Sequence, residues 1–323
     1  MSDELKIGEL FGGAADGGLF DIPVGDMGAV GDAGVVVIGC ATATPYESVG
    51  AYCAEGPDAI RAAVGWPGMG EHWDFDLGGT LLPAGVTALD WGNLPISTTD
   101  FAANRQLIQA TVEQILSAGA IPVVLGGDDS IPIPILAGYE NHVSEQGPVT
   151  ILQLDAHIDW RDEVQGERQG LSSNMRRASE MPWVETIVQV GARGSGSARP
   201  SDVQDARDWG VEFFPMKAVR SNGLEPVIEA IPEGGSVYVA LDIDVMDPSV
   251  VPGVIGPAPG GFQYGAVIDL LEAVAHKATI VGFNLAEFAP SADVGNRGAL
   301  VAARLAATAM GLIARQRSAG GVR

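Results

Sequence analysis

Short runs of β-branched and other apolar residues recur along the chain, and most of them are separated by segments with helical spacing. Eight such runs are typical of strands that are buried on both faces of a sheet. They are Val35 to Ile38, Val86 to Leu89, Ile121 to Leu125, Val149 to Leu154, Thr186 to Val190, Val211 to Phe214, Val237 to Leu241 and Thr279 to Phe283. The pattern predicts a sheet that is covered on both sides.

The segments between these runs place apolar residues at helical intervals. The helices expected from them are Phe101 to Ala118, Ile133 to Tyr139, Met175 to Met181, Ser201 to Trp209, Tyr264 to Ala275 and Leu300 to Arg315. Alternating strands and helices predict an α/β fold of three layers, α/β/α, around a mostly parallel sheet. Because the interior shows no repeat or low-complexity linker, we expect a single domain over residues 34–323. Residues 1–33, rich in Gly, Asp and Ala and without periodicity, are predicted to form an N-terminal arm.

Composition excludes several classes of protein. No stretch approaches the roughly 18 to 20 uninterrupted apolar residues that a membrane span needs. Residues 1–6 do not begin a signal or transit peptide, so we expect a cytoplasmic location. Cys40 and Cys53 are too few for a disulfide framework and suit free thiols in a reducing compartment.

The net charge of −23 excludes a basic surface for nucleic acid. Acidity alone is explained by solubility, but it would also attract a small cationic molecule. The charge therefore permits a cationic ligand without identifying one.

Acidic residues follow three of the predicted strands at their carboxyl ends, where open α/β sheets place their ligands. The three segments are Gly126-Gly127-Asp128-Asp129-Ser130, Asp155-Ala156-His157-Ile158-Asp159 and Asp242-Ile243-Asp244-Val245-Met246-Asp247-Pro248. In extended backbone alternate residues point the same way, so Asp155 and His157 are expected to face a common point. The same spacing relates Asp242 and Asp244.

Two interpretations of these aspartates remain open when each is taken singly. An isolated Asp after a strand is more often the N-cap of the next helix or a turn former. Several carboxylates in one crevice, however, would repel each other unless cations neutralised them. The set therefore predicts a site for divalent metal ions. Oxygen-rich ligation with little imidazole favours Mn²⁺, with Ni²⁺ as the next choice, and two cysteines cannot form a zinc ribbon.

Two further residues are candidates for contact with a substrate. Glu287 follows the apolar strand near Phe283 and could hold a planar cation through a bidentate pair of hydrogen bonds; without a metal cluster it would be an ordinary solvated loop residue. Trp160 either lines a pocket and stacks on a flat cation or packs in the core. The stiff, Pro- and Gly-rich loop at 252–261 would form a wall of that pocket.

The motifs together resemble the ureohydrolases, the family of arginases, agmatinases and related guanidino hydrolases, from about Gly34 to Arg315. The residues that carry the resemblance are the three acidic segments, Met175-Arg176-Arg177-Ala178 and Glu287, in the order of the family. The resemblance implies an eight-stranded parallel sheet, a trimeric or hexameric assembly and two metal ions. It implies that Asp129, Asp155, Asp159 and Asp242 hold one ion and that Asp155, His157, Asp242 and Asp244 hold the other.

The implied chemistry is attack of an activated water on a guanidino carbon, which releases urea and an amine. Asp159 would relay a proton to the leaving nitrogen, and Glu287 would orient the guanidinium group. Two positions depart from the usual pattern of the family. Asp129 stands where the first metal-ligand His is usual, and Leu171 stands where a proton-shuttling His precedes Arg176-Arg177 in many members. A branch of agmatinase-like proteins is similar in this region.

The leading hypothesis is an enzyme that cleaves agmatine or another small guanidino compound, working as a homo-oligomer. The alternative is a non-catalytic or weakly active subunit that assembles with an active paralogue, as in an alkylguanidine or metformin hydrolase. Loss of imidazole at Asp129 and Leu171 supports the alternative, whereas the remaining ligand residues support the enzyme. A one-zinc deacetylase of related fold ranks last, because the sequence lacks its paired histidines.

Overall fold

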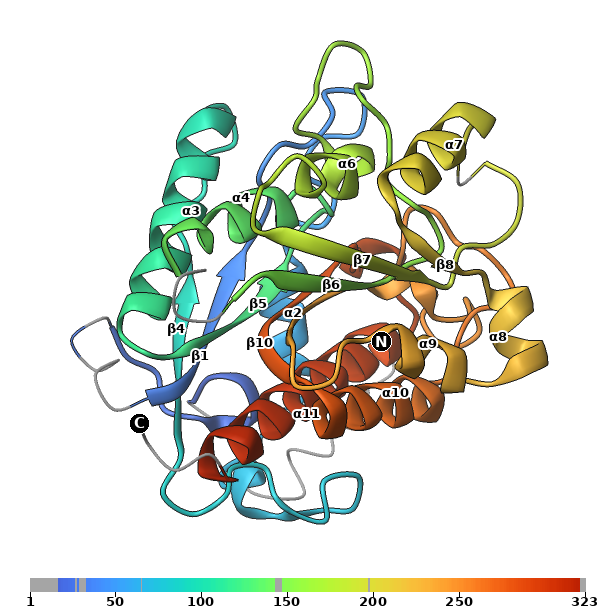
Figure 1. The fold of residues 1–323 in the computed structure, drawn as a ribbon. Helices are drawn as coiled ribbons and strands as arrows, with labels where there is room; N and C mark the ends of the chain where they lie inside the picture. Colours follow the sequence, from blue (N-terminus) through green and yellow to red (C-terminus); the bar gives the residue numbers. More distant parts are fainter. Residues whose placement is uncertain are drawn as a thin grey trace.

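Eight strands form one central sheet in which every neighbouring pair is parallel (Figure 1). The computed structural model describes residues 17–26, 28, 33–64, 66–142, 147–196 and 198–319. From one edge of the sheet to the other, the strands are β4 (Thr87–Asn93), β1 (Ala33–Cys40), β5 (Ile121–Gly126), β10 (Thr279–Ala286), β9 (Ser236–Asp242), β6 (Val149–Leu154), β7 (Val184–Val190) and β8 (Glu212–Phe214). This order puts β5, β10, β9 and β6 side by side in the middle of the sheet.

Successive residues of the central strands pack into two different cores, one on each face of the sheet. In β5, Val123 and Leu125 belong to one core and Val124 belongs to the other. The alternation follows from the pleat of a strand, which points neighbouring side chains to opposite faces. Because both faces are covered, β5 and β6 are buried along their whole length and have no polar face.

Helices cover the two faces in separate layers (Figure 1). One layer contains α2 (Gly56–Ala63), α8 (Met216–Asn222), α9 (Glu225–Ala230), α10 (Tyr264–Lys277) and α11 (Arg297–Ala319). The other contains α3 (Phe101–Ser117), α4 (Pro132–Ala137), α6 (Asn174–Ala178) and α7 (Pro200–Trp209). This arrangement confirms the predicted three-layer α/β/α fold.

Short elements complete the described part of the chain. The 3₁₀ helices are η1 (Leu19–Asp21), η3 (Met69–Glu71), η4 (Glu140–His142), η5 (Leu171–Ser173), η6 (Ile243–Val245) and η7 (Pro290–Ala292). A two-stranded antiparallel sheet pairs β2 (Trp73–Asp74) with β3 (Gly79–Thr80).

The eight predicted strands all occur, and their bounds differ from the prediction by a few residues at most. The sequence analysis did not anticipate α2, α8 and α9, which have eight, seven and six residues. Helices this short carry only about two turns of the apolar repeat, so periodicity alone gives them a weak signal.

The predicted N-terminal arm lies partly outside the described residues, which omit 1–16, 27 and 29–32. The described piece at 17–26 packs on the domain: Leu19 and Phe20 are buried in the core that contains α11. The backbone N–H of Leu19 donates to Asp90 Oδ2 at 2.9 Å. The division into an arm and a domain stays a prediction.

One helix of the described residues is long and apolar enough, by length and composition, to cross a membrane. It is Arg297–Ser318 within α11, with a mean hydropathy of 1.3 over its most apolar window. Of that window, 78% is buried inside the fold, where α11 packs against α10, β10 and β1. Its composition is that of a core helix.

Candidate metal centre

The carboxyl ends of the four central strands supply all the residues that the sequence analysis assigned to metal or proton transfer. Asp129 follows β5, Glu287 follows β10, and Asp242 ends β9 with Asp244 in η6 just beyond it. The segment from Asp155 to Asp159 follows β6. Because parallel strands end at the same edge of the sheet, positions far apart in sequence meet there.

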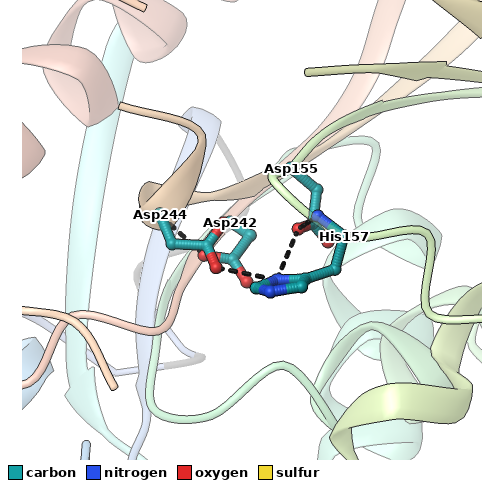
Figure 2. Close-up of side chains that lie close together, drawn as sticks. All are labelled: Asp155, His157, Asp242 and Asp244. Carbon is teal, nitrogen blue, oxygen red and sulfur yellow. Dashed lines mark hydrogen bonds and ion pairs between the residues drawn. The ribbon is translucent and has the colours of Figure 1, made fainter. Parts of the chain in front are cut away.

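Four side chains form the first possible metal site, and Figure 2 shows them converging on the imidazole of His157. They are Asp155, His157, Asp242 and Asp244, and each offers one ligand atom within 4.8 Å of the others. His157 Nδ1 lies 2.9 Å from Asp244 Oδ2 and 3.4 Å from Asp155 Oδ1. The backbone N–H of Ala156 donates to Asp244 Oδ1 at 2.9 Å, which holds the β6 and β9 segments together.

A second cluster consists of Asp129, Asp155 and Asp159, with the same limit of 4.8 Å between their ligand atoms. Asp155 belongs to both clusters and can bridge two ions. The set implied by the family resemblance also included Asp242 here, whereas the structure groups Asp242 only with the first cluster. All three carboxylates are buried.

Burial and mutual repulsion disturb the ionisation of this cluster. Burial raises the pKa of Asp129 well above its usual value, and the charges of Asp159 and Asp155 raise it further. The pKa of Asp242 is raised in the same way, by burial and then by the charges of Asp244 and Asp155. Oxygen ligands with a single imidazole in this electrostatic state fit a pair of hard divalent cations, which would neutralise the charge.

His157 contacts two carboxylates of the cluster through Nδ1. Burial acts to lower the pKa of His157, but hydrogen bonds to Asp155 and Asp244 outweigh it and raise that pKa to about 11. Burial would likewise raise the pKa of Asp155, yet hydrogen bonding and the charge of His157 lower it overall. A bound metal ion would replace the proton on the His157 imidazole, because a ligating imidazole must be neutral.

Glu287 lies beside the second cluster with a carboxylate that is 4% exposed. The Tyr52 hydroxyl contacts its two oxygens at 2.7 and 2.6 Å, and the backbone N–H of Asp129 donates to Oε1 at 2.8 Å. Burial raises the pKa of Glu287 to about 8 against the opposing effect of the Tyr52 hydrogen bond. Each carboxylate oxygen can accept more than one hydrogen bond, so acceptor capacity remains for a cation.

Two site residues have backbone conformations that side chains rarely adopt. Asp159 has φ 45° and Glu287 has φ 67°, both in the left-handed region. Such a residue costs roughly 1–2 kcal/mol and persists only when its surroundings impose it. The hydrogen bond from Glu287 N to Gly127 O, at 2.8 Å, links this strained turn to the loop that carries Asp129.

A cavity of about 250 Å³ opens over both clusters. Its lining includes Glu287, Trp160, and Ile255 and Gly256 of the loop that was expected to wall the pocket. Trp160 lines the cavity and also packs against Trp209 with ring centroids 6.1 Å apart, whereas its stacking on a cation stays a prediction. Arg161 and Asp202 also line the cavity and form an ion pair at 3.0 Å.

The sequence model of the arginase family matches residues 33–311, which is most of the chain and includes every residue of the two clusters. This chain belongs to the arginase family. The motifs that suggested the ureohydrolases therefore identified the correct family.

Individual members of the arginase family are similar to this chain in sequence and in structure. The chain is 34% identical over 211 residues to N(1)-aminopropylagmatine ureohydrolase of Thermus thermophilus, covering 65% of this chain and 68% of that protein. It is 29% identical over 225 residues to guanidinobutyrase of Pseudomonas aeruginosa, covering 68% and 69%. The structure of proclavaminate amidino hydrolase from Streptomyces clavuligerus superposes with a TM-score of 0.81 at 26% identity, covering 94% of this chain and 99% of that chain.

Sequence reasoning missed several side chains that hold the ligands of this arginase-family site. Gln153 Nε2 donates to Asp155 Oδ2 at 2.6 Å, and Gln189 in turn donates to Gln153. Tyr52 and Asn174 also contact site carboxylates. The available signal for Gln153 and Gln189 was that each lies between buried apolar residues of its strand. Tyr52 lies before the short helix α2 and Asn174 is the first residue of α6, and the sequence gives no comparable signal at either position.

Two acidic residues of the motifs have other roles. The Asp128 carboxylate bonds to the hydroxyls of Thr42 and Ser130 and joins neither cluster. Asp247 accepts from Ser249 N at 3.0 Å and from Gly260 N at 2.7 Å, and so shapes the loop beside the cavity. Both fit the turn-forming role that an isolated aspartate suggests.

Proposed function

We propose that this protein is a metal-dependent hydrolase that cleaves the guanidino group of agmatine or a related small guanidino compound to urea and an amine. At the level of reaction class, the arginase-family chain is a hydrolase of carbon–nitrogen bonds in linear amidines, since its relatives include named ureohydrolases. The observation that carries the proposal is the pair of ligand clusters sharing Asp155 below a cavity that Glu287 also lines.

The proposal assigns the two ions to the two observed clusters. Asp155, His157, Asp242 and Asp244 would hold one ion, and Asp129, Asp155 and Asp159 would hold the other. When bound, a pair of divalent ions neutralises the carboxylates and lowers the pKa of water toward neutrality. Mn²⁺ is the proposed metal and Ni²⁺ the next candidate, because hard oxygen ligands dominate both clusters.

The protein groups around the clusters would bind and orient the substrate. Glu287 accepts hydrogen bonds from two N–H groups of the guanidinium and fixes the plane of the cation. Trp160 bounds the space in which that plane lies. The cavity walls limit the access of bulk water to the bound substrate. This strengthens the contacts of the guanidinium with Glu287 and Trp160.

Asp159 is the proposed proton carrier. Burial raises the pKa of Asp159 well above its usual value, and the charge of Asp155 raises it further, which favours uptake of a proton by this carboxylate over an exposed one. A proton on Asp159 could then pass to the leaving nitrogen as the amine departs. The positive φ of Asp159 turns its backbone sharply at this point of the cavity.

The tail of the substrate would lie along the outer cavity, past Leu171 and Ile255 toward the Arg161–Asp202 ion pair. The outer wall thus offers both signs of charge beside apolar surface. Agmatine ends in an amine, which would pair with Asp202, and guanidinobutyrate ends in a carboxylate, which would pair with Arg161. A panel that contains both compounds will show which of the two residues contacts the tail of the substrate.

Assembly and location belong to the same proposal. We expect a trimeric or hexameric homo-oligomer, and the exposed apolar side chains of Val24, Trp73 and Phe75, at 61%, 63% and 90% exposure, are candidates for its interface. We expect cytoplasmic function, since Cys40 and Cys53 are buried free thiols. The alternative of a non-catalytic partner subunit is not favoured, because the relatives are named enzymes and the ligand clusters are present.

The decisive experiment is urea release by the protein reconstituted with Mn²⁺ or Ni²⁺. The panel consists of agmatine, guanidinobutyrate, arginine, guanidine and methylated guanidines, each with protein expressed without any paralogue. We expect urea from at least one compound and none after chelation of the metal. Protein that binds its metal pair yet releases urea from no member of the panel would contradict the proposed reaction.

A further inference from the structure

Asn174 lies at the start of α6 and reaches from there into the second cluster. Its side chain is fully buried. The side-chain nitrogen Nδ2 donates to a carboxylate oxygen of Asp129 and lies 3.1 Å from Asp159 Oδ2. It also lies 2.8 Å from the backbone oxygen of Asp129 and 3.1 Å from that of Leu171. One amide group therefore bridges the two aspartates that complete the second cluster.

The surrounding oxygens establish which end of the amide is the donor. Four acceptors surround Nδ2, and rotating the amide by half a turn would put Oδ1 against all four oxygens. The two hydrogens of the NH₂ group cannot fully satisfy four acceptors. Asn174 Oδ1 has no hydrogen-bond partner although it is buried. Burying an unpaired acceptor costs about 1–3 kcal/mol, so this orientation needs a compensating gain.

The gain lies in the charge of the cluster. Asp129, Asp155 and Asp159 are three buried carboxylates whose ligand atoms all lie within 4.8 Å of one another. A neutral donor between the carboxylates of Asp129 and Asp159 offsets their repulsion without adding a cation, and it fixes the direction of the oxygens that remain for an ion.

We propose that Asn174 is a positioning residue for the ion held by Asp129, Asp155 and Asp159: its amide bridges Asp129 and Asp159 and fixes the oxygens that these two aspartates present to the ion. The inference rests on the two-ion site of the proposed function. It predicts that the two ions respond differently to loss of Asn174, because the cluster of Asp155, His157, Asp242 and Asp244 has no contact with that amide among the bonds of the described residues.

The test is calorimetric titration of the metal-free protein with Mn²⁺, combined with a metal count after dialysis. Asn174→Ala should weaken one of the two Mn²⁺ sites by about 10- to 100-fold and leave the other within a factor of about three, as is typical for loss of a group that orients ligands. Asn174→Leu retains side-chain volume without the donor, so it should show the same selective loss. Recovery of normal affinity in Asn174→Leu would show that packing, and not the donor, was responsible.

Asn104→Ala is the matched control. Asn104 is also a buried asparagine, 1% exposed, and it holds the segment before α3 through Ser97, away from the metal cluster. It should lose thermal stability while keeping both Mn²⁺ affinities. Equal weakening of one ion in Asn104→Ala would overturn the specific role of Asn174, as would unchanged affinities in Asn174→Ala. A wild-type protein that binds no second ion would contradict the metal pair itself, whereas two ions held equally well by wild type and Asn174→Ala would contradict only the role of Asn174.

Discussion

Asp242 illustrates what a buried carboxylate costs when no cation accompanies it. Its pKa is raised by burial and by the charges of Asp244 and Asp155, so the folded metal-free protein holds a proton there more tightly than the unfolded chain does. A group with a raised folded-state pKa destabilises the fold as pH rises above the unfolded value of about 4. The contribution of Asp242 to the stability of the metal-free protein should therefore decrease as the pH rises above about 4.

Asp242→Asn removes this cost and one metal ligand together. At neutral pH we expect the metal-free variant to melt above the metal-free wild type, by about 2–4 °C for each kcal/mol gained. With saturating Mn²⁺ the order should reverse, because the wild type then gains binding energy that the variant lacks. Thermal unfolding with and without chelator measures both. A variant that is less stable in both conditions would contradict the electrostatic account.

Glu287 is predicted to act through its charge on the substrate and not through metal binding. Glu287→Gln should lower kcat/KM by about 10- to 150-fold, which corresponds to 1.5–3 kcal/mol for a hydrogen bond to a charged group. Tyr52→Phe is the comparison: it removes the hydroxyl that contacts Glu287 but keeps the carboxylate, so its loss should be smaller. Steady-state kinetics at constant metal content checks both. Unchanged kcat/KM in Glu287→Gln would exclude the assigned role.

At the scale of elements, the position of the site follows from how the strands end. Runs such as Ile121–Leu125 and Val149–Leu154 predicted the strands because their burial on both faces leaves an apolar signature. The ligands at 155, 157, 242 and 244 could be predicted because each pair lies at the carboxyl end of a strand. The extended backbone expected for the second pair was wrong, since Asp244 lies in the 3₁₀ helix η6. Tyr52 and Asn174 could not be predicted, since their contacts depend on how separate loops pack and not on any local pattern.

Gly191 permits the close approach of two strand ends. It has φ 117°, and a Cβ there would lie 2.5 Å from the backbone oxygen of Asp155 and 2.6 Å from Val245. Gly191→Ala should lower the free energy of unfolding by about 3 kcal/mol or more and weaken metal binding, because backbone cannot move aside cheaply. Urea denaturation and a metal count report the two effects.

Gly210→Ala is the matched control for that prediction. Gly210 has φ 111° and nothing within 4 Å of the corresponding Cβ position, so the substitution tests the backbone conformation alone. It should cost only about 1–2 kcal/mol and leave metal binding intact. Equal losses in the two variants would mean that the approach to Asp155 is unimportant.

For the whole molecule, the fold brings together carboxylates that a chain of net charge −23 would otherwise keep apart. The sheet order places β5, β10, β9 and β6 next to each other, and the ends of those strands meet at one cavity. Part of the acidity that the sequence analysis attributed to solubility is thus concentrated at this cavity. The chemistry of the substrate's tail could not be predicted from composition, because the cavity that would hold it is lined in part by loops such as 252–261.

The most direct measurement is the number of Mn²⁺ ions per chain in wild type and three single variants after equilibrium dialysis. Asp155 belongs to both clusters, whereas His157 and Asp159 each belong to one. We predict about two ions for wild type, about one for His157→Ala and for Asp159→Asn, and close to none for Asp155→Asn. A wild-type protein that retains no Mn²⁺, or an Asp155→Asn variant that retains both ions, would contradict the account.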